Sequence, residues 1–427
     1  MSRRPMAIAS LVVAIISPAL AGPLSPPAGA PTSTGKTLSE LEPRIALSPD
    51  NTPGDANSVF KITELGSYYL TDNLRVPEGF AGIEIIQGAT VDLNGFNIQR
   101  DTSITNGSAI RVNTNGNAAV RIMNGSVRLI PTGIEDGGDA DRVTVESVSF
   151  ATIDSHAIEL DNEAMIKQCR FENVGGAAIL VGANASIEDV VAQDCGSASQ
   201  PAIETSGASR VSDTIVRSAL GDALEVGPRS VVDRVQLNTP GGRGLLGGSR
   251  TAVRDSLFSA TGAEGAELGQ ASQVSSCVFD NCTGVALLIE TDLSSNPSGA
   301  RIIDCSFFFN ANGSIDGLRG ADAGLSESLI RGCLVNGTGD GPQILLQGSN
   351  RVEACHFTFS SAIRTEGSRN SIIDCSFSST DVVLNSSNNF VTKCMFSGTA
   401  SLTDNGGGNF APAPVTSPSG AWDNADR

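Results

Sequence analysis

Short runs of alternating apolar and polar residues recur along the chain from about residue 58, separated by turns rich in Gly, Asn and Ser. Each repeat holds two such runs. The first ends near a Cys-x-Phe step, as in MIKQCRF (165–171), and the second is typified by GAAILV (176–181). Alternation over so few residues is typical of β-strands, and no stretch keeps a sustained helical period. The pattern therefore predicts an all-β chain built from repeats.

The cysteines mark the register of these repeats. Seven of the nine cysteines occupy one column, and the remaining units place another small or apolar residue there. From residue 148 to residue 394 the column advances by about 22 residues per repeat, a length typical of a solenoid coil. Because no helices separate the strands, we predict a single-stranded parallel β-helix of about 14 coils. A leucine-rich horseshoe is disfavoured because its LxxLxLxxN signature is absent. The column reads Val148, Cys169, Val190, Thr214, Val235, Ser256, Cys277, Cys305, Cys333, Cys355, Cys375 and Cys394.

The ends of the chain differ in composition from the repeats. Residues 1–21 combine Arg3 and Arg4, an apolar stretch and a final Ala-Leu-Ala, which predicts a secretory signal peptide and hence an exported, secreted, periplasmic or cell-surface protein. The predicted organisation is a signal peptide (1–21), a flexible leader rich in Pro, Ser and Thr (22–57), an N-terminal cap (58–89), the β-helix (90–404) and a C-terminal tail (405–427).

The cysteine column exchanges with Val, Thr and Ser, so we expect it to point inward as core, where cysteine behaves as a small hydrophobe. Export would favour disulfides, but side chains in one column run parallel to each other. Cys195 and Cys282 lie off the column and in repeats that are not adjacent. We therefore expect buried free thiols, with disulfides or a metal site as the alternatives.

The charge balance limits the partners. The chain has 46 acidic and 28 basic residues and a net charge of −18. Nucleic acids and anionic membrane surfaces favour basic proteins, so we expect neither nucleic-acid binding nor membrane insertion after signal cleavage. A glycan or a divalent cation remains compatible with this charge.

The position before the cysteine column should face solvent, and four consecutive repeats place charged residues there: Asp189, Asp213, Arg234 and Asp255. Stacked at the spacing of adjacent coils, they could bind a sugar or a cation or perform acid–base chemistry. The alternative is a solvated ladder in which Arg234 offsets the repulsion between its acidic neighbours.

A second candidate is the acidic turn GIEDGGDAD (133–141), where Glu135, Asp136, Asp139 and Asp141 offer oxygen ligands suited to Ca²⁺. Their spacing differs from that of a DxDxDG loop, so an ordinary polar loop is the alternative. No other cofactor is indicated, and His156 and His356 have no partner at metal-ligand spacing.

The block ITELGSYYLTDNLRVP, GIEII, ATVDLNGFNI, together with VRIMNGSV and the later repeats, resembles the pectate-lyase-like right-handed parallel β-helix superfamily. Within it, the chain is most similar to exported bacterial β-helix repeat proteins of unassigned activity. The resemblance implies a right-handed β-helix and a protein that binds or acts on polysaccharides. The catalytic motifs of galacturonases and a lyase-type basic motif are absent from the sequence.

Three classes of function remain open at this stage. The first is an exported protein that binds carbohydrate or acts at the cell surface without a conventional active site. The second is a divergent polysaccharide lyase, hydrolase or epimerase. The third is a structural or adhesive solenoid.

Overall fold

The computed structural model describes residues 44–101, 105–114, 116, 118–138, 141–289, 299–308, 318–320, 325–336, 344–358 and 363–411. The chain divides into a unit of Met1–Pro43 and a unit of Arg44–Arg427, and only the second contains described residues. The predicted signal peptide, most of the leader and the tail beyond residue 411 therefore lie outside the described residues. No helix in the described part is long and apolar enough to cross a membrane.

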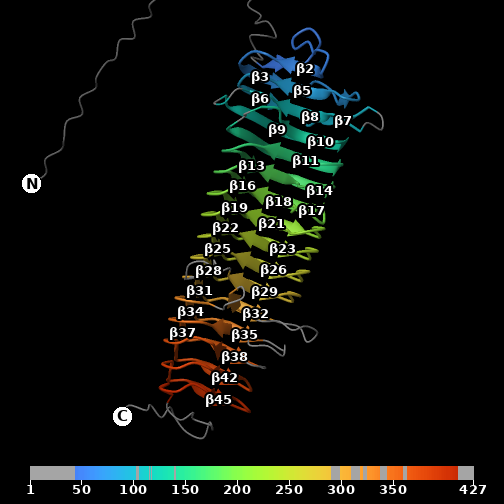
Figure 1. Ribbon diagram of the computed structural model, residues 1–427. Helices are drawn as coiled ribbons and strands as arrows, with labels where there is room; N and C mark the ends of the chain where they lie inside the picture. The colour runs from blue at the N-terminus through green and yellow to red at the C-terminus, as the bar shows by residue number, and fades with distance from the viewer. Residues whose placement is uncertain are drawn as a thin grey trace, which may run out of the picture. The chain divides into compact units, whose positions relative to one another are not determined.

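The predicted parallel β-helix is confirmed, and Figure 1 shows its strands stacked one coil above the next. A typical coil has three strands, such as β16 (Ser186–Glu188), β17 (Val191–Cys195) and β18 (Ile203–Thr205). Each strand pairs in parallel with its counterpart in the next coil. The first and second strands join in one 29-stranded sheet because β9 (Val120–Ile130) and β11 (Val143–Ile153) continue through the corner between them.

The strands fall into three columns. The first comprises β1 (Ile45–Ala46), β3 (Gly66–Tyr69), β6 (Ala89–Asp92), β13 (Met165–Lys167), β16, β19 (Arg210–Ser212), β22 (Val231–Asp233), β25 (Ala252–Arg254), β28 (Gln273–Ser275), β31 (Arg301–Ile303), β34 (Leu329–Arg331), β37 (Arg351–Glu353), β40 (Ser371–Ile373) and β43 (Phe390–Thr392). The second comprises β4 (Leu74–Val76), β7 (Asn97–Arg100), β14 (Arg170–Val174), β17, β20 (Ile215–Arg217), β23 (Gln236–Asn238), β26 (Leu257–Ser259), β29 (Val278–Asp280), β32 (Ser306–Phe308), β35 (Leu334–Asn336), β38 (His356–Thr358), β41 (Ser376–Ser378) and β44 (Met395–Ser397).

The third column forms a separate 16-stranded sheet, here called the third sheet. It comprises β2 (Ser58–Ile62), β5 (Ala81–Ile85), β8 (Ser108–Val112), β10 (Thr132–Asp136), β12 (Ile158–Leu160), β15 (Ile179–Val181), β18, β21 (Leu224–Val226), β24 (Leu245–Gly247), β27 (Ala266–Leu268), β30 (Leu287–Ile289), β33 (Leu318–Gly320), β36 (Ile344–Leu346), β39 (Ile363–Thr365), β42 (Asp381–Leu384) and β45 (Ser401–Asp404).

The stack begins earlier in the sequence than we predicted. Strands β2 and β5 lie within residues 58–89, which we assigned to a cap, yet they pair in parallel as full members of the third sheet. Strand β1 lies within the assigned leader and pairs with β3, and the neighbouring Leu47 is buried. With β2 and β5, the third sheet has 16 strands in the described part of the chain, where we expected about 14 coils.

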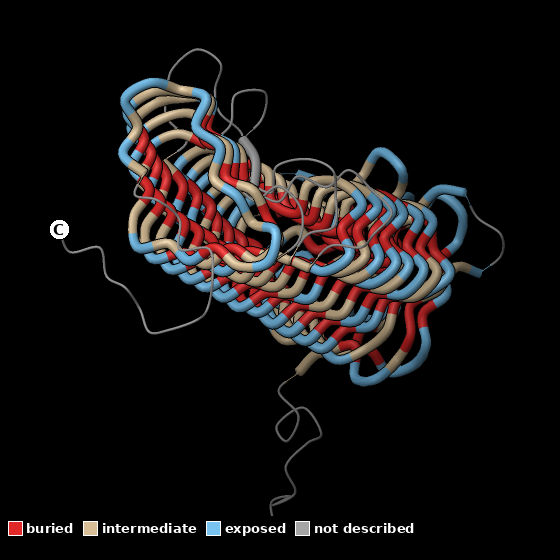
Figure 2. The backbone as a smooth tube through the Cα atoms, turned by 90° about the horizontal axis from the view of Figure 1, so that it is seen from below, coloured by how far each residue is buried: buried red, intermediate tan, exposed pale blue. Residues whose placement is uncertain are grey.

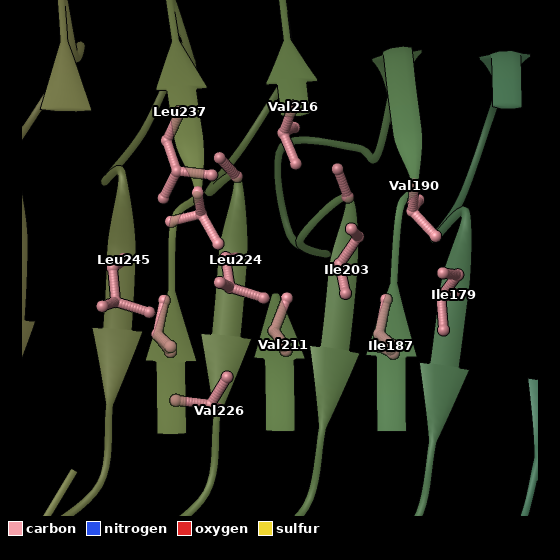
Figure 3. Packing of buried hydrophobic residues seen from close by; sticks show 14 of the residues in the cluster. Ile179, Ile187, Val190, Ile203, Val211, Val216, Leu224, Val226, Leu237 and Leu245 are labelled. Atoms are coloured by element: carbon pink, nitrogen blue, oxygen red, sulfur yellow. The ribbon is translucent and has the colours of Figure 1, made fainter. Parts of the chain in front are cut away.

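The interior is built from columns of like side chains. Figure 2 shows that buried positions recur in step from coil to coil, and Figure 3 shows aliphatic side chains from successive strands packed against each other. Phe279 stacks on Phe258 at 4.6 Å and on Phe307 at 5.0 Å between ring centroids. Because neighbouring strands lie about 4.8 Å apart, an aromatic ring repeated at one position stacks almost face to face.

The cysteine column points inward, as predicted. All nine cysteines are free, eight are buried and Cys394 is half-buried. Each column thiol donates to the carbonyl two residues earlier, as Cys277 Sγ does to Ser275 at 3.2 Å. Burial raises the pKa of the Cys169 thiol to about 11 and that of Cys195 to about 12. The cysteines therefore serve as core side chains.

Candidate functional site

The predicted charged ladder lies at a corner of the coil, between its first and second strands. Asp189, Asp213, Arg234 and Asp255 are all exposed, as expected. Each has a positive φ between 50° and 54°, which is the left-handed region. Asp and Asn adopt this conformation more readily than most residues. Part of the acidic character of this column therefore follows from backbone geometry, which the sequence analysis did not consider.

Within this ladder the structure brings together Asp213 and Arg234. Arg234 donates from Nε and Nη2 to the two carboxylate oxygens of Asp213 at 2.7 and 2.6 Å, and from Nη1 to Asp233 at 2.6 Å. Asp233 is buried and also accepts from Arg210 Nη2 at 3.1 Å. The hydrogen bonds from Arg234 lower the pKa of Asp213. This four-residue network is internally neutral, so its charges satisfy each other.

The other two residues of the ladder, Asp189 and Asp255, are not part of this network. Among the described residues, Asp189 and Asp255 form no side-chain hydrogen bond and no ion pair. All four lie on neighbouring coils. The backbone N–H groups of Asp189, Asp213 and Arg234 donate to the backbone carbonyls of Ser212, Asp233 and Arg254 in the next coil. Their predicted role in catalysis or binding stays a prediction.

The acidic turn proposed for Ca²⁺ is only partly described, because Asp139 lies outside the described residues. Glu135 accepts from Arg111 Nε at 2.7 Å, and the Asp136 carboxylate accepts from the Gly138 backbone N–H at 2.8 Å. The part of the chain that the structure describes holds no group of three His, Cys, Asp or Glu side chains able to hold a metal ion. The calcium site stays a prediction.

The two histidines have structural partners. His156 Nδ1 accepts from the Ala177 backbone N–H at 3.1 Å in the next coil. His356 Nδ1 lies in hydrogen-bond contact with Ser376 Oγ on the following strand. Both contacts join adjacent coils, so each histidine helps to hold the stack together.

A second charged surface, which the sequence analysis missed, lies on the outer face of the third sheet. Its centre is the middle residue of each strand, where Glu204 and Glu225 are register partners on β18 and β21, and Leu246 and Glu267 follow on β24 and β27. All four side chains are half-buried. We call this surface, together with Asp222 and Arg243 from the turns that lead into its strands, the third-sheet face.

Arg243 is the centre of the third-sheet face. Its Nε and Nη2 donate to Asp222 at 3.0 and 2.8 Å, and its Nη1 donates to Glu267 at 2.8 Å. The side chains of Asp222 and Glu267 are only 19% and 15% exposed, so these pairs are held more rigidly than ordinary surface pairs. The guanidinium therefore joins three consecutive coils in one fixed arrangement.

Glu225 has no such partner among the residues that the structure describes. Partial burial, and then the neighbouring negative charge of Glu204, raise the pKa of the Glu225 carboxyl, although Arg243 opposes the shift. Carboxylates with raised pKa values are more common at functional sites than elsewhere. The environment of Glu225 thus disfavours the charged form of its carboxyl group.

The sequence did contain a signal for this face. The second run of a repeat has a residue between two positions that face the core, and Glu recurs there in AIELD (157–161), AIETS (202–206), ALEVG (223–227) and AELG (266–269). An outward column read through these runs would have found the glutamates. Arg243 would still have been missed because it lies in a turn.

A shallow depression borders the third-sheet face, at the corner that follows it in each coil. It encloses about 470 Å³. None of Asp189, Asp213, Arg234 and Asp255 lines it. Its lining comes from four consecutive coils and consists of Ala183, Asn184, Gly207, Ala208, Pro228, Arg229, Ser249 and Arg250.

Residues 132–357 match the family model described as "Right handed beta helix region". No protein with a curated description matches the chain significantly. Among solved structures, the mannuronan C-5 epimerase AlgE4 A-module of Azotobacter vinelandii is 11% identical, with a TM-score of 0.32 and coverage of 83% of this chain and 91% of that one.

Two further structures show comparable values. The Streptococcus pneumoniae surface protein and adhesin PfbA is 10% identical, with a TM-score of 0.26 and coverage of 81% and 91%. The siphovirus 9NA tailspike receptor binding domain is 10% identical, with a TM-score of 0.29 and coverage of 84% and 74%. At these values, nothing about ligand or activity follows from the likeness.

Proposed function

The chain belongs to the right-handed β-helix family, and from that premise we propose that it is an exported carbohydrate-binding protein whose ligand lies along the third-sheet face. The observation that carries this proposal is the arrangement of Asp222, Glu225, Arg243 and Glu267. All four side chains are half-buried, and ion pairs join Asp222, Arg243 and Glu267 across successive coils.

Such an arrangement suits a polymer of sugars. A polysaccharide presents hydroxyl groups at regular intervals, and strands of this face present carboxylates and a guanidinium at intervals of about 4.8 Å. Carboxylates accept hydrogen bonds from hydroxyls, and a guanidinium donates them in a fixed plane. Because ion pairs already fix Arg243 and Glu267, little side-chain freedom is lost on binding.

The sequence supports the extracellular part of the proposal. The predicted signal peptide at residues 1–21 would direct export, and the net charge of −18 disfavours nucleic acid and anionic membranes as partners. A cell-surface or secreted location would place the third-sheet face in contact with glycans.

The test is a glycan array followed by titration calorimetry with the glycans bound. We expect binding by the native protein and at least a tenfold loss for Arg243→Ala, since each hydrogen bond to a charged group contributes about 1.5–3 kcal/mol. Arg254→Ala is the matched control, because Arg254 is exposed and has no ion pair among the described residues. An equal loss in both variants, or no glycan bound by the native protein, would refute the proposal.

One observation favours glycoside hydrolysis as a second candidate. Glu204 and Glu225 are register partners on adjacent strands, and the pKa of Glu225 is raised. Strand spacing is close to the roughly 5–5.5 Å between the carboxyl groups of retaining glycosidases. Glu225 would act as general acid and Glu204 as nucleophile. Reducing-sugar release from a bound glycan, abolished in Glu225→Gln, is expected; unchanged release in that variant would exclude this assignment.

A further inference from the structure

The depression beside the third-sheet face differs in charge from the rest of the chain. Acidic residues outnumber basic ones by 46 to 28 overall, yet the lining includes Arg229 and Arg250 and no acidic side chain. Both arginines are exposed, and within the described residues neither side chain forms an ion pair or hydrogen bond. They contrast with Arg210, Arg234 and Arg243, each of which is paired with a carboxylate.

Two neutral polar groups accompany the arginines. Asn184 lies two coils before Arg229, and Ser249 directly precedes Arg250. Neither side chain makes a hydrogen bond among the described residues, so the amide and the hydroxyl are both free to bind a ligand. The depression therefore offers two guanidinium groups and two smaller polar groups on one surface.

The backbone turns beside the depression are tightly packed. A Cβ atom on Gly248 would lie 2.5 Å from the Pro228 nitrogen, and one on Gly227 would lie 2.4 Å from the Gly207 nitrogen. The chain cannot place larger side chains at these two positions without moving the coils apart. The apolar part of the lining consists of Ala183, Ala208 and Pro228 and is here called the apolar floor.

We propose that this depression is a binding site for the anionic group, a carboxylate or a sulfate ester, of an acidic saccharide. The inference rests on the proposed function, because the third-sheet face would hold the neutral part of the same ligand. Two unpaired guanidinium groups on adjacent coils form charge-assisted, bidentate hydrogen bonds with planar or tetrahedral oxyanions. The apolar floor accepts the C–H face of the sugar ring.

The order of residues along each coil indicates that one ligand can contact both the third-sheet face and the depression. Glu225 on β21 is followed four residues later by Arg229, and Leu246 on β24 is followed four residues later by Arg250. A saccharide that contacts the centre of the third-sheet face thus reaches the depression at the next corner. The unpaired glutamates of the third-sheet face, Glu204 and Glu225, repel anions, whereas the arginines of the depression attract them, so the anionic group has one favoured position.

The experiment compares anionic glycans with their neutral counterparts: polygalacturonate against its methyl ester, and dextran sulfate against dextran. We expect tighter binding of one anionic member, weakening with salt, and a loss of about tenfold for Arg229→Gln or Arg250→Gln. Polygalacturonate and dextran sulfate distinguish a carboxylate from a sulfate ester. Arg369→Gln is the matched control, since Arg369 occupies the same corner column with φ 66° and lies outside the depression.

The outcomes separate this inference from the proposed function. Binding of neutral and anionic glycans with equal affinity, unaffected by either variant, overturns the inference and leaves the proposed function standing. Equal losses in Arg369→Gln and Arg229→Gln also overturn it, because they show a general effect of charge. If the native protein binds no saccharide, both proposals fail. Circular dichroism melting of each variant verifies that it is folded.

Discussion

Glu225 lies beside Glu204 on the neighbouring parallel strand, and within the described residues neither carboxylate forms an ion pair. Two strands away, Glu267 accepts a hydrogen bond from Arg243. The same outward column therefore contains one glutamate that is paired with a guanidinium and one whose charged form is disfavoured. Substituting each of these two glutamates in turn would therefore measure how its surroundings affect the free energy of unfolding.

Replacing Glu225 by Gln should stabilise the protein at neutral pH. The raised pKa means that the folded state binds more protons than the unfolded state at pH values between the unfolded and folded pKa values. The free energy of unfolding therefore falls as pH rises through this window. We expect Glu225→Gln to gain less than about 1 kcal/mol at pH 7, because solvent screens a half-exposed group, and nothing near pH 3.

Thermal melts at these two pH values measure the effect. Glu267→Gln is the control, and it should destabilise the protein at pH 7 because it removes the charge that Arg243 binds. A loss of stability at pH 7 in Glu225→Gln would contradict the raised pKa.

The backbone conformation at Asp255 predicts a different effect. Asp255 has φ 50° and no ion pair among the described residues, so its substitution isolates the cost of the left-handed conformation. Asp255→Val should lower the free energy of unfolding by about 1–2 kcal/mol, because a β-branched residue is strained there. Asp255→Asn should leave it unchanged. Urea denaturation compares them, and equal stability of the two variants would show that charge, and not backbone conformation, selects this residue.

A buried asparagine ladder should stabilise the C-terminal coils. Asn370 Oδ1 accepts from the Asn350 backbone N–H at 3.1 Å, and its Nδ2 donates to Asn389 Oδ1 at 3.0 Å. Asn370→Ala leaves these groups buried without partners, so we expect a loss of about 2–3 kcal/mol in chemical denaturation. Asn385, which is only half-buried and lies outside the ladder, serves as control, and Asn385→Ala should cost clearly less than Asn370→Ala. Comparable effects of the two substitutions would contradict a stabilising role for the ladder.

The thiols should be unreactive in the folded protein. Eight of the nine are buried, and burial raises the pKa of Cys169 to about 11, so little thiolate is present at neutral pH. Ellman's reagent should modify the half-buried Cys394 first and the others only after unfolding. Nine thiols should titrate in denaturant without reductant. Fewer would show that disulfides form, contrary to the free cysteines of this structure.

The stacking of the coils could be predicted from the sequence alone. Because side chains alternate between the two faces of a strand, the shared spacing of Cys169, Cys277 and Cys394 was enough to place one column inside and its neighbours outside. The same alternation would have revealed Glu204, Glu225 and Glu267, had the second runs been read in this way. The alternation of side chains within a strand and the succession of the coils both follow directly from the sequence.

The pairing of charges was decided only by the tertiary structure. Stacking places each corner residue beside two others, and rotamers then determine that Arg234 binds Asp213 and Asp233 instead of Asp255. Likewise, Arg243 reaches Asp222 and Glu267 from turns and strands more than 20 residues away in the chain. The unpaired state of Arg229 and Arg250 depends on which carboxylates come within reach, and that distance is set by the geometry of the assembled coils.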